Sequence, residues 1–197
     1  MLCLLILIYY LTDTGAAVFR VPGGPKAEFM EASVNASFSV APEHFREAMS
    51  RVGAAVHIVT TDGPAGRAGV TASAVTSVSA EPPTMLFCLN KTSRAASLLL
   101  QNGVFCINTL ASAHQDLSDI FAGRTQHCAD ERFAAADWGA LTTGAPVLAS
   151  ALAAFDCRLI EAKEMSTHLI LIGRVEAIEV APKTEALLYM HRTYRQV

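Results

Sequence analysis

The 197-residue sequence is short of charged and aromatic side chains. Charged residues make up 17% of the chain and aromatic residues 7%, and Trp138 is the single tryptophan. The formal net charge is −3, with lysines and arginines scattered rather than gathered in a stripe, which argues against a nucleic-acid-binding surface. Apolar residues reach 52%, a globular composition, and the length suggests one domain with a substantial core.

The sequence also lacks paired cysteines and the common nucleotide-binding motifs. Its five cysteines, Cys3, Cys88, Cys106, Cys128 and Cys157, have no close spacing, so we expect a reduced, cytoplasmic protein rather than a disulfide framework. A hydrolase built on Cys106 or Cys157 is disfavoured, because a thiol inside an apolar strand reacts poorly. No GxGxxG or GxxxxGK[ST] motif occurs, and no histidine–cysteine spacing fits a metal site.

The first forty residues differ from the rest of the chain. Residues 2–11 are ten apolar residues with no Lys or Arg before them, too short a run to span a bilayer and a poor signal peptide. Residues 12–39 are rich in Gly, Pro and Ala without periodicity. We expect a poorly ordered arm over residues 1–40, a domain over residues 41–197 and no stable membrane insertion. Our hypothesis is that Met30 is the natural start; a membrane-surface anchor is the alternative.

The most informative stretch is residues 68–93. Small residues and hydroxyls alternate along its first half, which predicts a strand with a core face and an open face that carries Thr71, Ser73, Ser77 and Ser79. A proline pair ends this strand, and residues 84–89 predict a second one. The second strand delivers Asn90-Lys91-Thr92-Ser93 to the start of a helix, where a cation, hydroxyls and backbone N–H groups suit a phosphate. The two strands together suit a planar ring with a phosphate tail.

The remaining pattern favours an antiparallel barrel over a doubly wound sheet, because connections are short and βαβ alternations few. Helical spacing marks residues 42–52, 94–102 and 112–121, with a helical turn at 129–133. Residues 138–146 are predicted as a loop. Strands are predicted over residues 54–61, 104–110, the end of 148–161 and 168–178, the last with Gly173 as a bulge or a close backbone approach.

The sequence resembles the flavin reductase family, with the FMN-binding split-barrel fold, over residues 45–194. The segments that carry the resemblance occur in order and include GRAGVTASAVTSVS, PPTMLFCLNKTS, NGVFCINTL, FAGRT, STHLILIGRV and LLYMHRTY. The resemblance implies a mainly β, Greek-key antiparallel split barrel with a few flanking helices. It also implies a homodimer with each flavin near the subunit interface.

The resemblance also implies a set of cofactor-binding residues. The family's T-A-S/T-A strand matches Thr71, Ala72, Ser73 and Ala74, along the isoalloxazine ring. The N-x-x-S segment matches Asn90, Lys91, Thr92 and Ser93, near the ribityl phosphate. The F-A-G segment matches Phe121, Ala122 and Gly123, with Arg124 following, and closes on the flavin.

The nicotinamide side is implied in the same way. His168 matches the family's strand-entry histidine and is the candidate catalytic residue, steering the dinucleotide without strict acid–base work. The carboxy-terminal L-x-Y…R-x-Y pattern matches Tyr189, Arg192 and Tyr194, near the same pocket. Ser166 stands where many members have glycine.

The implied function is an NAD(P)H-dependent flavin reductase, which transfers hydride from NADH or NADPH to FMN or FAD and supplies reduced flavin to a partner monooxygenase. The alternative is an FMN-containing corrin reductase of the cob(II)yrinic acid a,c-diamide type, with the flavin as a prosthetic group. A third possibility is a flavin-binding module without turnover. Each site residue also has an ordinary structural role to weigh against these: Thr71 and Ser73 as solvated hydroxyls, Lys91 as a surface charge, Phe121 as core, Arg124 at a helix end and His168 as a hydrogen-bonded strand residue.

Overall fold

A computed structural model describes residues 9–11, 17–19, 40–182 and 184–197. The chain divides into two units, Met1–Ala41 and Pro42–Val197, and each is described by itself. In the first unit, β1 (Tyr9–Leu11) pairs antiparallel with β2 (Ala17–Phe19). The arm expected over residues 1–40 and the hypothesis of a start at Met30 fall largely outside the described residues, so both stay predictions.

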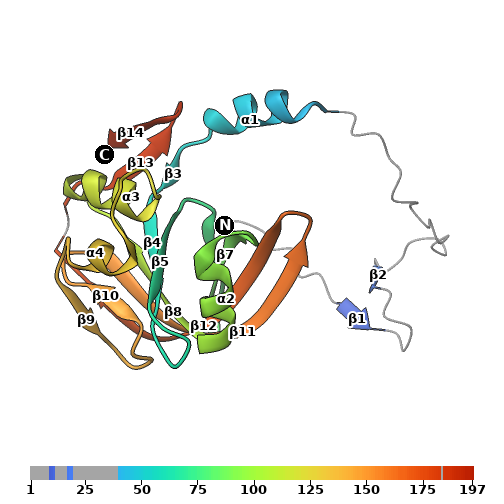
Figure 1. The fold of residues 1–197 in the computed structure, drawn as a ribbon. Coiled ribbons are helices and arrows are strands. Elements are labelled where there is room, and N and C mark those ends of the chain that lie inside the picture. Colours follow the sequence, from blue (N-terminus) through green and yellow to red (C-terminus); the bar gives the residue numbers. More distant parts are fainter. Residues whose placement is uncertain (1–8, 12–16, 20–39, 183) are drawn as a thin grey trace. The chain divides into compact units, whose positions relative to one another are not determined.

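The second unit is built on a seven-stranded antiparallel sheet, in the order β5-β4-β8-β11-β12-β7-β6. Its strands are β4 (His57–Thr61), β5 (Ala68–Ala72), β6 (Val75–Ala80), β7 (Pro83–Asn90), β8 (Val104–Thr109), β11 (Ala153–Met165) and β12 (His168–Val180). The first and last strands of this order, β5 and β6, are consecutive in the chain, so the sheet curls round to meet itself (Figure 1). The predicted antiparallel split-barrel class is confirmed.

The single strand predicted over the first half of residues 68–93 is wrong in one respect. The strand breaks at Ser73 and Ala74, hereafter the 73–74 corner. Here the chain leaves β5, at one end of the strand order, and enters β6, at the other end. The backbone N–H of Cys88 in β7 donates to the carbonyl of Ala74 at 2.9 Å, which anchors the corner. A register shift between Ser77 and Ser79 then leaves Val78 half-exposed instead of in the core.

Two small sheets flank the barrel. β3 (Ala54–Ala55), β13 (Leu187–Met190) and β14 (Thr193–Gln196) form a three-stranded sheet in the order β14-β13-β3. β9 (Trp138–Ala140) pairs with β10 (Pro146–Leu148), so the loop predicted over residues 138–146 is wrong. Pro146 is tolerated as the first residue of a strand, and the packing of Trp138 against Phe121 and Phe133 holds the hairpin in place.

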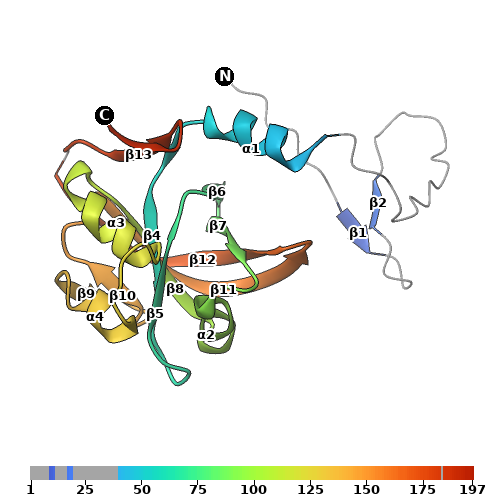
Figure 2. The ribbon, with the colours of Figure 1, turned by 45° about the horizontal axis from the view of Figure 1, so that its top comes forward.

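The helices are α1 (Pro42–Ser50), α2 (Arg94–Asn102), the 3₁₀ turn η1 (Ser112–His114), α3 (Gln115–Phe121) and α4 (Ala129–Phe133). α2 begins and ends as the sequence predicts: Ser93 caps its first turn by accepting from the N–H of Ala95, and Gly103 ends it with φ 66°. Its buried face, with Ala95, Ala96 and Leu99, packs into the barrel core beside β5 (Figure 2). The helix predicted over 112–121 is divided into η1 and α3.

Gly173 is a close backbone approach, as predicted. A Cβ at this position would lie 2.4 Å from Cζ of Phe105 and 3.0 Å from Cβ of Cys157. Phe105 in turn packs edge-on against Phe87, with ring centroids 5.1 Å apart. Glycine at this point of β12 therefore leaves room for the aromatic centre of the barrel.

His57 is a buried imidazole on β4, with Nδ1 3.1 Å from Oγ1 of Thr109. Burial lowers its pKa to about 4. The unfolded chain takes up this proton near pH 6.5 and the folded chain only near pH 4, so acid favours unfolding between these values. From His57 alone we expect a loss of roughly 3 kcal/mol of unfolding free energy between pH 7 and pH 4.

The measurement is urea unfolding of the wild type and of His57→Gln at pH 7, 5.5 and 4. Glutamine keeps a hydrogen-bonding group near Thr109 but does not titrate in this range. Carboxylates change the unfolding free energy of both proteins with pH, so the difference between the wild type and the variant isolates His57. If the unfolding free energies of the two proteins changed equally with pH, the lowered pKa of His57 would be contradicted.

Candidate functional site

The 73–74 corner is an open surface of small side chains. Ser73 and Ala74 are exposed, while Val70 and Ala72 of β5 pack on the barrel core, as the alternation predicts. The hydrogen bond from Cys88 to Ala74 places the corner beside β7, two residues before Asn90. Two residues of strand span roughly 7 Å, which the ribityl chain of a flavin can bridge.

The turn over residues 90–93, hereafter the 90–93 turn, is tightly organised. Oδ1 of Asn90 accepts from both the backbone N–H and the hydroxyl of Thr92 at 2.9 Å, and the N–H of Ser93 donates to the carbonyl of Asn90 at 3.0 Å. Ser93 then caps α2. These bonds use the N–H groups of Thr92 and Ser93 within the turn, so the partial positive charge at this place comes from the start of α2.

The β11–β12 hairpin supports this turn from the other side. His168 lies opposite Asn90 in the β7–β12 register, and the backbone N–H of Lys91 donates to the carbonyl of Thr167 at 3.1 Å. Nδ1 of His168 lies 2.9 Å from Oγ1 of Thr167. Ser166 adopts φ 51°, the left-handed conformation that glycine favours.

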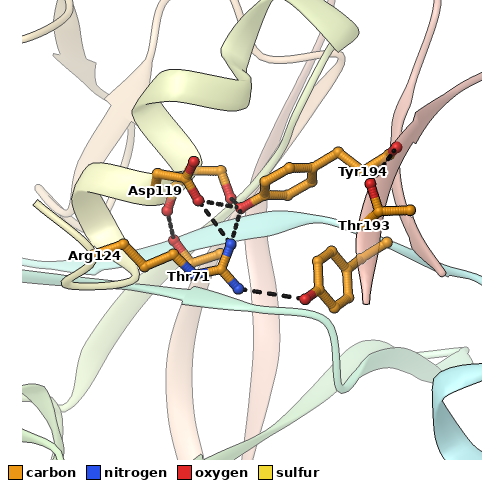
Figure 3. A network of polar contacts seen from close by, with 7 residues as sticks. Thr71, Asp119, Arg124, Thr193 and Tyr194 are labelled. Carbon is orange, nitrogen blue, oxygen red and sulfur yellow. Dashed lines mark hydrogen bonds and ion pairs between the residues drawn. The ribbon is translucent and has the colours of Figure 1, made fainter. Parts of the chain in front are cut away.

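A second cluster, a network of polar side chains, joins β5, the end of α3 and the carboxy-terminal hairpin (Figure 3). Thr71 donates from Oγ1 to the carbonyl of Ser118 at 2.7 Å. The Tyr194 hydroxyl donates to Oδ1 of Asp119 at 2.9 Å, and since a carboxylate only accepts, the Ser118 hydroxyl donates to Tyr194 at 2.9 Å. These bonds fix β5 and the carboxy-terminal hairpin to α3, the helix whose last residue begins the FAG segment.

Arg124 is the cation of this network. Its guanidinium donates to Oδ1 of Asp119 at 2.8 Å and lies 5.7 Å from the ring centroids of both Tyr189 and Tyr194. Hydrogen bonds to Tyr189 and Asp119 raise the pKa of Arg124, so the cation is permanent. Burial raises the pKa of Tyr194, which keeps its hydroxyl protonated as a donor.

The structure separates the residues that the sequence analysis placed together on the nicotinamide side. His168 lies at the 90–93 turn, whereas Tyr189 and Tyr194 lie with Arg124 and Thr71. Arg192 points elsewhere: it forms an ion pair with Glu47 of α1 at 2.8 Å. Their roles toward a ligand stay predictions.

The FAG segment is partly core. Phe121 is 2% exposed as a whole residue, and a Cβ on Gly69 would lie 2.5 Å from its ring. The exposed Ala122 and Gly123 are therefore the parts of the segment that a ligand could reach. Gly123 has φ 72°, a conformation that suits glycine.

Four residues were missed by the sequence analysis: Arg94, Ser118, Asp119 and Glu164, whose carboxylate forms an ion pair with Lys91. Arg94 is the exposed first residue of α2 and adds a second cation to the 90–93 turn. Its position directly after a serine cap was a usable signal. Ser118, Asp119 and Glu164 act through partners more than 40 residues away in the sequence, and no local pattern marks them.

A separate shallow cavity of about 450 Å³ lies beside α3. Nδ1 of His114 accepts from the N–H of Ala111, so the proton lies on Nε2, which donates to the Ser150 hydroxyl at 2.9 Å. The histidine therefore cannot act as a base toward this serine. Burial also lowers the pKa of His114.

Thiol and metal chemistry find no support in the described residues. Cys88, Cys106, Cys128 and Cys157 are free, and burial raises the pKa of Cys157 to about 12 and also raises that of Cys106. Within residues 40–182 and 184–197 and the two short strands before them, no three His, Cys, Asp or Glu side chains gather as metal ligands. In the same part of the chain, no helix has the length and apolar character needed to cross a membrane.

Comparisons with known proteins identify the family of this chain. The family model of the flavin reductase like domain matches residues 49–197. FMN reductase (NADH) RutF 2 of Methylorubrum extorquens (strain PA1) is 55% identical over 157 residues, which is 80% of this chain and 90% of that protein.

Solved structures agree as well. A crystal structure assigned to a flavin reductase of Haemophilus somnus 129PT has a TM-score of 0.77 at 44% identity, covering 80% of this chain and 100% of that one. BorF, the flavin reductase component of a bacterial two-component tryptophan halogenase, has a TM-score of 0.74 at 30% identity, over 80% and 98% of the two chains. Both of these solved structures are named as flavin reductases. The chain belongs to the flavin reductase family.

Proposed function

We propose that this chain is an NADH-dependent FMN reductase that releases its reduced flavin to a separate monooxygenase. The observation that carries the proposal is the pairing of the open 73–74 corner with the polar 90–93 turn along one stretch of β7. The relative from Methylorubrum extorquens is named an FMN reductase that uses NADH, and this supports FMN over FAD and NADH over NADPH.

In this proposal the residues bind and orient, while FMN, when bound, supplies the hydride-accepting chemistry. The small side chains of Ser73 and Ala74 leave one face of the ring close to the backbone. Lys91, Arg94 and the Ser93 hydroxyl, which only accepts in the cap of α2, hold the phosphate with charge-assisted hydrogen bonds. The network of Thr71, Asp119 and Arg124 keeps β5 and the FAG segment fixed relative to each other, which preserves the orientation on which hydride transfer depends.

Anaerobic stopped-flow spectroscopy tests the function. Purified protein is mixed with FMN or FAD and with NADH or NADPH, and flavin bleaching is followed. We expect the fastest reduction with FMN and NADH, and loss of flavin on gel filtration. Flavin that stays bound through the column would favour a prosthetic group and a different acceptor, and absence of NADH oxidation with either flavin would contradict the proposal.

His168 is proposed to position the dinucleotide. It is exposed beside the 90–93 turn, so its imidazole can meet a phosphate or the nicotinamide end of the nucleotide. We expect His168→Ala to raise KM for NADH by about fivefold, an effect of ~1 kcal/mol, with the FMN dissociation constant nearly unchanged. Unchanged steady-state kinetics would remove His168 from the site.

A homodimer is proposed for the assembly. Helix α1 buries none of its residues. Phe45 on this helix is 60% exposed and Met49 is half-exposed, and the half-exposed Val52 follows two residues after the helix ends. An apolar surface of this kind is typical of interaction sites. Light scattering on a size-exclusion column should give twice the monomer mass, and Phe45→Glu should shift the protein toward the monomer.

The partner and compartment are also proposals. BorF is the reductase component of a two-component system, which supports a separate enzyme as the acceptor of reduced flavin. The free thiols of the described residues support a cytoplasmic location.

A further inference from the structure

Glu164 lies near the tip of the β11–β12 hairpin and forms an ion pair with the Lys91 ammonium. Its placement is set by backbone contacts rather than by the ion pair alone. The N–H of Lys91 donates to Thr167, and Asn90 lies opposite His168, so the hairpin tip and the 90–93 turn are joined. A carboxylate is thereby held next to the cation that would receive a phosphate.

Arg94, the first residue of α2, is a second cation at the 90–93 turn. His168 pairs one register position beyond Glu164, so strand alternation points its side chain to the other face of the hairpin. Lys163 is the neighbour of Glu164 on β11, but strand alternation points it to the other face of the hairpin. Glu164 is therefore the acidic side chain that opposes an incoming anion.

The ion pair is also weak enough to exchange. The Lys91 side chain is 38% exposed and that of Glu164 is 66% exposed, and ion pairs so open to solvent contribute little to stability. A phosphate monoester, with a charge of about −2 near neutral pH, competes effectively for the same ammonium.

We infer that Glu164 competes with the phosphate of FMN for Lys91 and so keeps the flavin exchangeable. The inference rests on the proposed function, because it takes the 90–93 turn as the phosphate site. When FMN binds, Lys91 leaves Glu164 for the phosphate; when the flavin departs, the ion pair forms again. The carboxylate raises the FMN dissociation constant, which favours release of reduced flavin to another enzyme over retention.

The experiment compares the wild type with Glu164→Gln. Dissociation constants for FMN and for riboflavin, which lacks the phosphate, are measured by flavin fluorescence, and the dissociation rate of FMN by stopped-flow displacement. We expect Glu164→Gln to bind FMN about fivefold more tightly, to release it more slowly and to bind riboflavin as the wild type does. The difference in FMN affinity should shrink as ionic strength rises, because the competition is electrostatic.

Two further variants make the result specific. Glu161→Gln removes an exposed carboxylate from the same strand and should change neither dissociation constant. Lys91→Met should weaken FMN about tenfold and riboflavin not at all, and in its background Glu164→Gln should change the FMN constant less than twofold.

The three variants distinguish a failure of the inference about Glu164 from a failure of the proposed phosphate site. An unchanged or weakened FMN affinity in Glu164→Gln, with Lys91→Met still weakening FMN, overturns the inference and leaves the phosphate site standing. A fivefold effect that persists in the Lys91→Met background overturns competition for Lys91. Full FMN affinity in Lys91→Met shows that the phosphate lies elsewhere, and the inference then fails together with the proposed site.

Discussion

Ala74→Leu is expected to weaken FMN binding by about 100-fold, equivalent to ~2.7 kcal/mol. Ala74 is exposed at the 73–74 corner, where the proposed ring lies close to the backbone. A leucine side chain there occupies the space of the ring, and an exposed position imposes little strain on the fold. Flavin fluorescence gives the dissociation constant, and the FMN-stimulated rate of NADH oxidation should fall in parallel.

The matched control is Ala80→Leu. Ala80 is also exposed, at the far end of β6 where it pairs with Pro83. The FMN dissociation constant of Ala80→Leu should lie within about twofold of the wild-type value, a difference of ~0.4 kcal/mol. Equal affinities for the wild type and Ala74→Leu, with both variants folded, would remove the ring from the corner.

Gly173→Val is expected to lower the free energy of unfolding by about 3 kcal/mol. The new Cβ would lie 2.4 Å from Cζ of Phe105 in the barrel centre, and Phe105 is held between Phe87 and β11, so the ring cannot simply move away. Valine is a good strand former, so a loss of stability reports the contact rather than the backbone. Chemical denaturation at pH 7 measures the change.

Gly139→Val serves as the comparison. Gly139 also lies in a strand, β9, but a Cβ there has no neighbour within 4 Å. The free energy of unfolding of Gly139→Val should stay within about 0.5 kcal/mol of the wild-type value. If Gly173→Val were equally neutral, the barrel centre would be looser than the structure indicates.

Local patterns in the sequence predicted most elements but not the break at the 73–74 corner. Alternation with period 2 continues across Ser73 and Ala74, so nothing local marks an end. The break arises because β5 must pair with β4 while β6 pairs with β7, a non-local requirement of barrel closure. The hairpin of β9 and β10 was missed for a similar reason, since Trp138 is held by Phe121 and Phe133 from elsewhere in the fold.

The candidate site was predictable where its residues are adjacent in the chain. The turn, the serine cap and the helix over residues 90–102 follow from local chemistry, and the structure has them. The polar partners were not predictable: Asp119 meets Tyr194 and Glu164 meets Lys91 across more than 70 residues. Arg192 was grouped with Tyr189 because of the resemblance to the family's carboxy-terminal pattern, yet its place at the tip of a hairpin directs it to Glu47.

The most direct measurement is a crystal structure of the protein with FMN. The proposed site predicts density for the isoalloxazine ring against Ser73 and Ala74 and for the phosphate against Lys91, Ser93 and Arg94. Flavin density in the cavity beside α3 that His114 and Ser150 line, or anywhere away from β7, would contradict it.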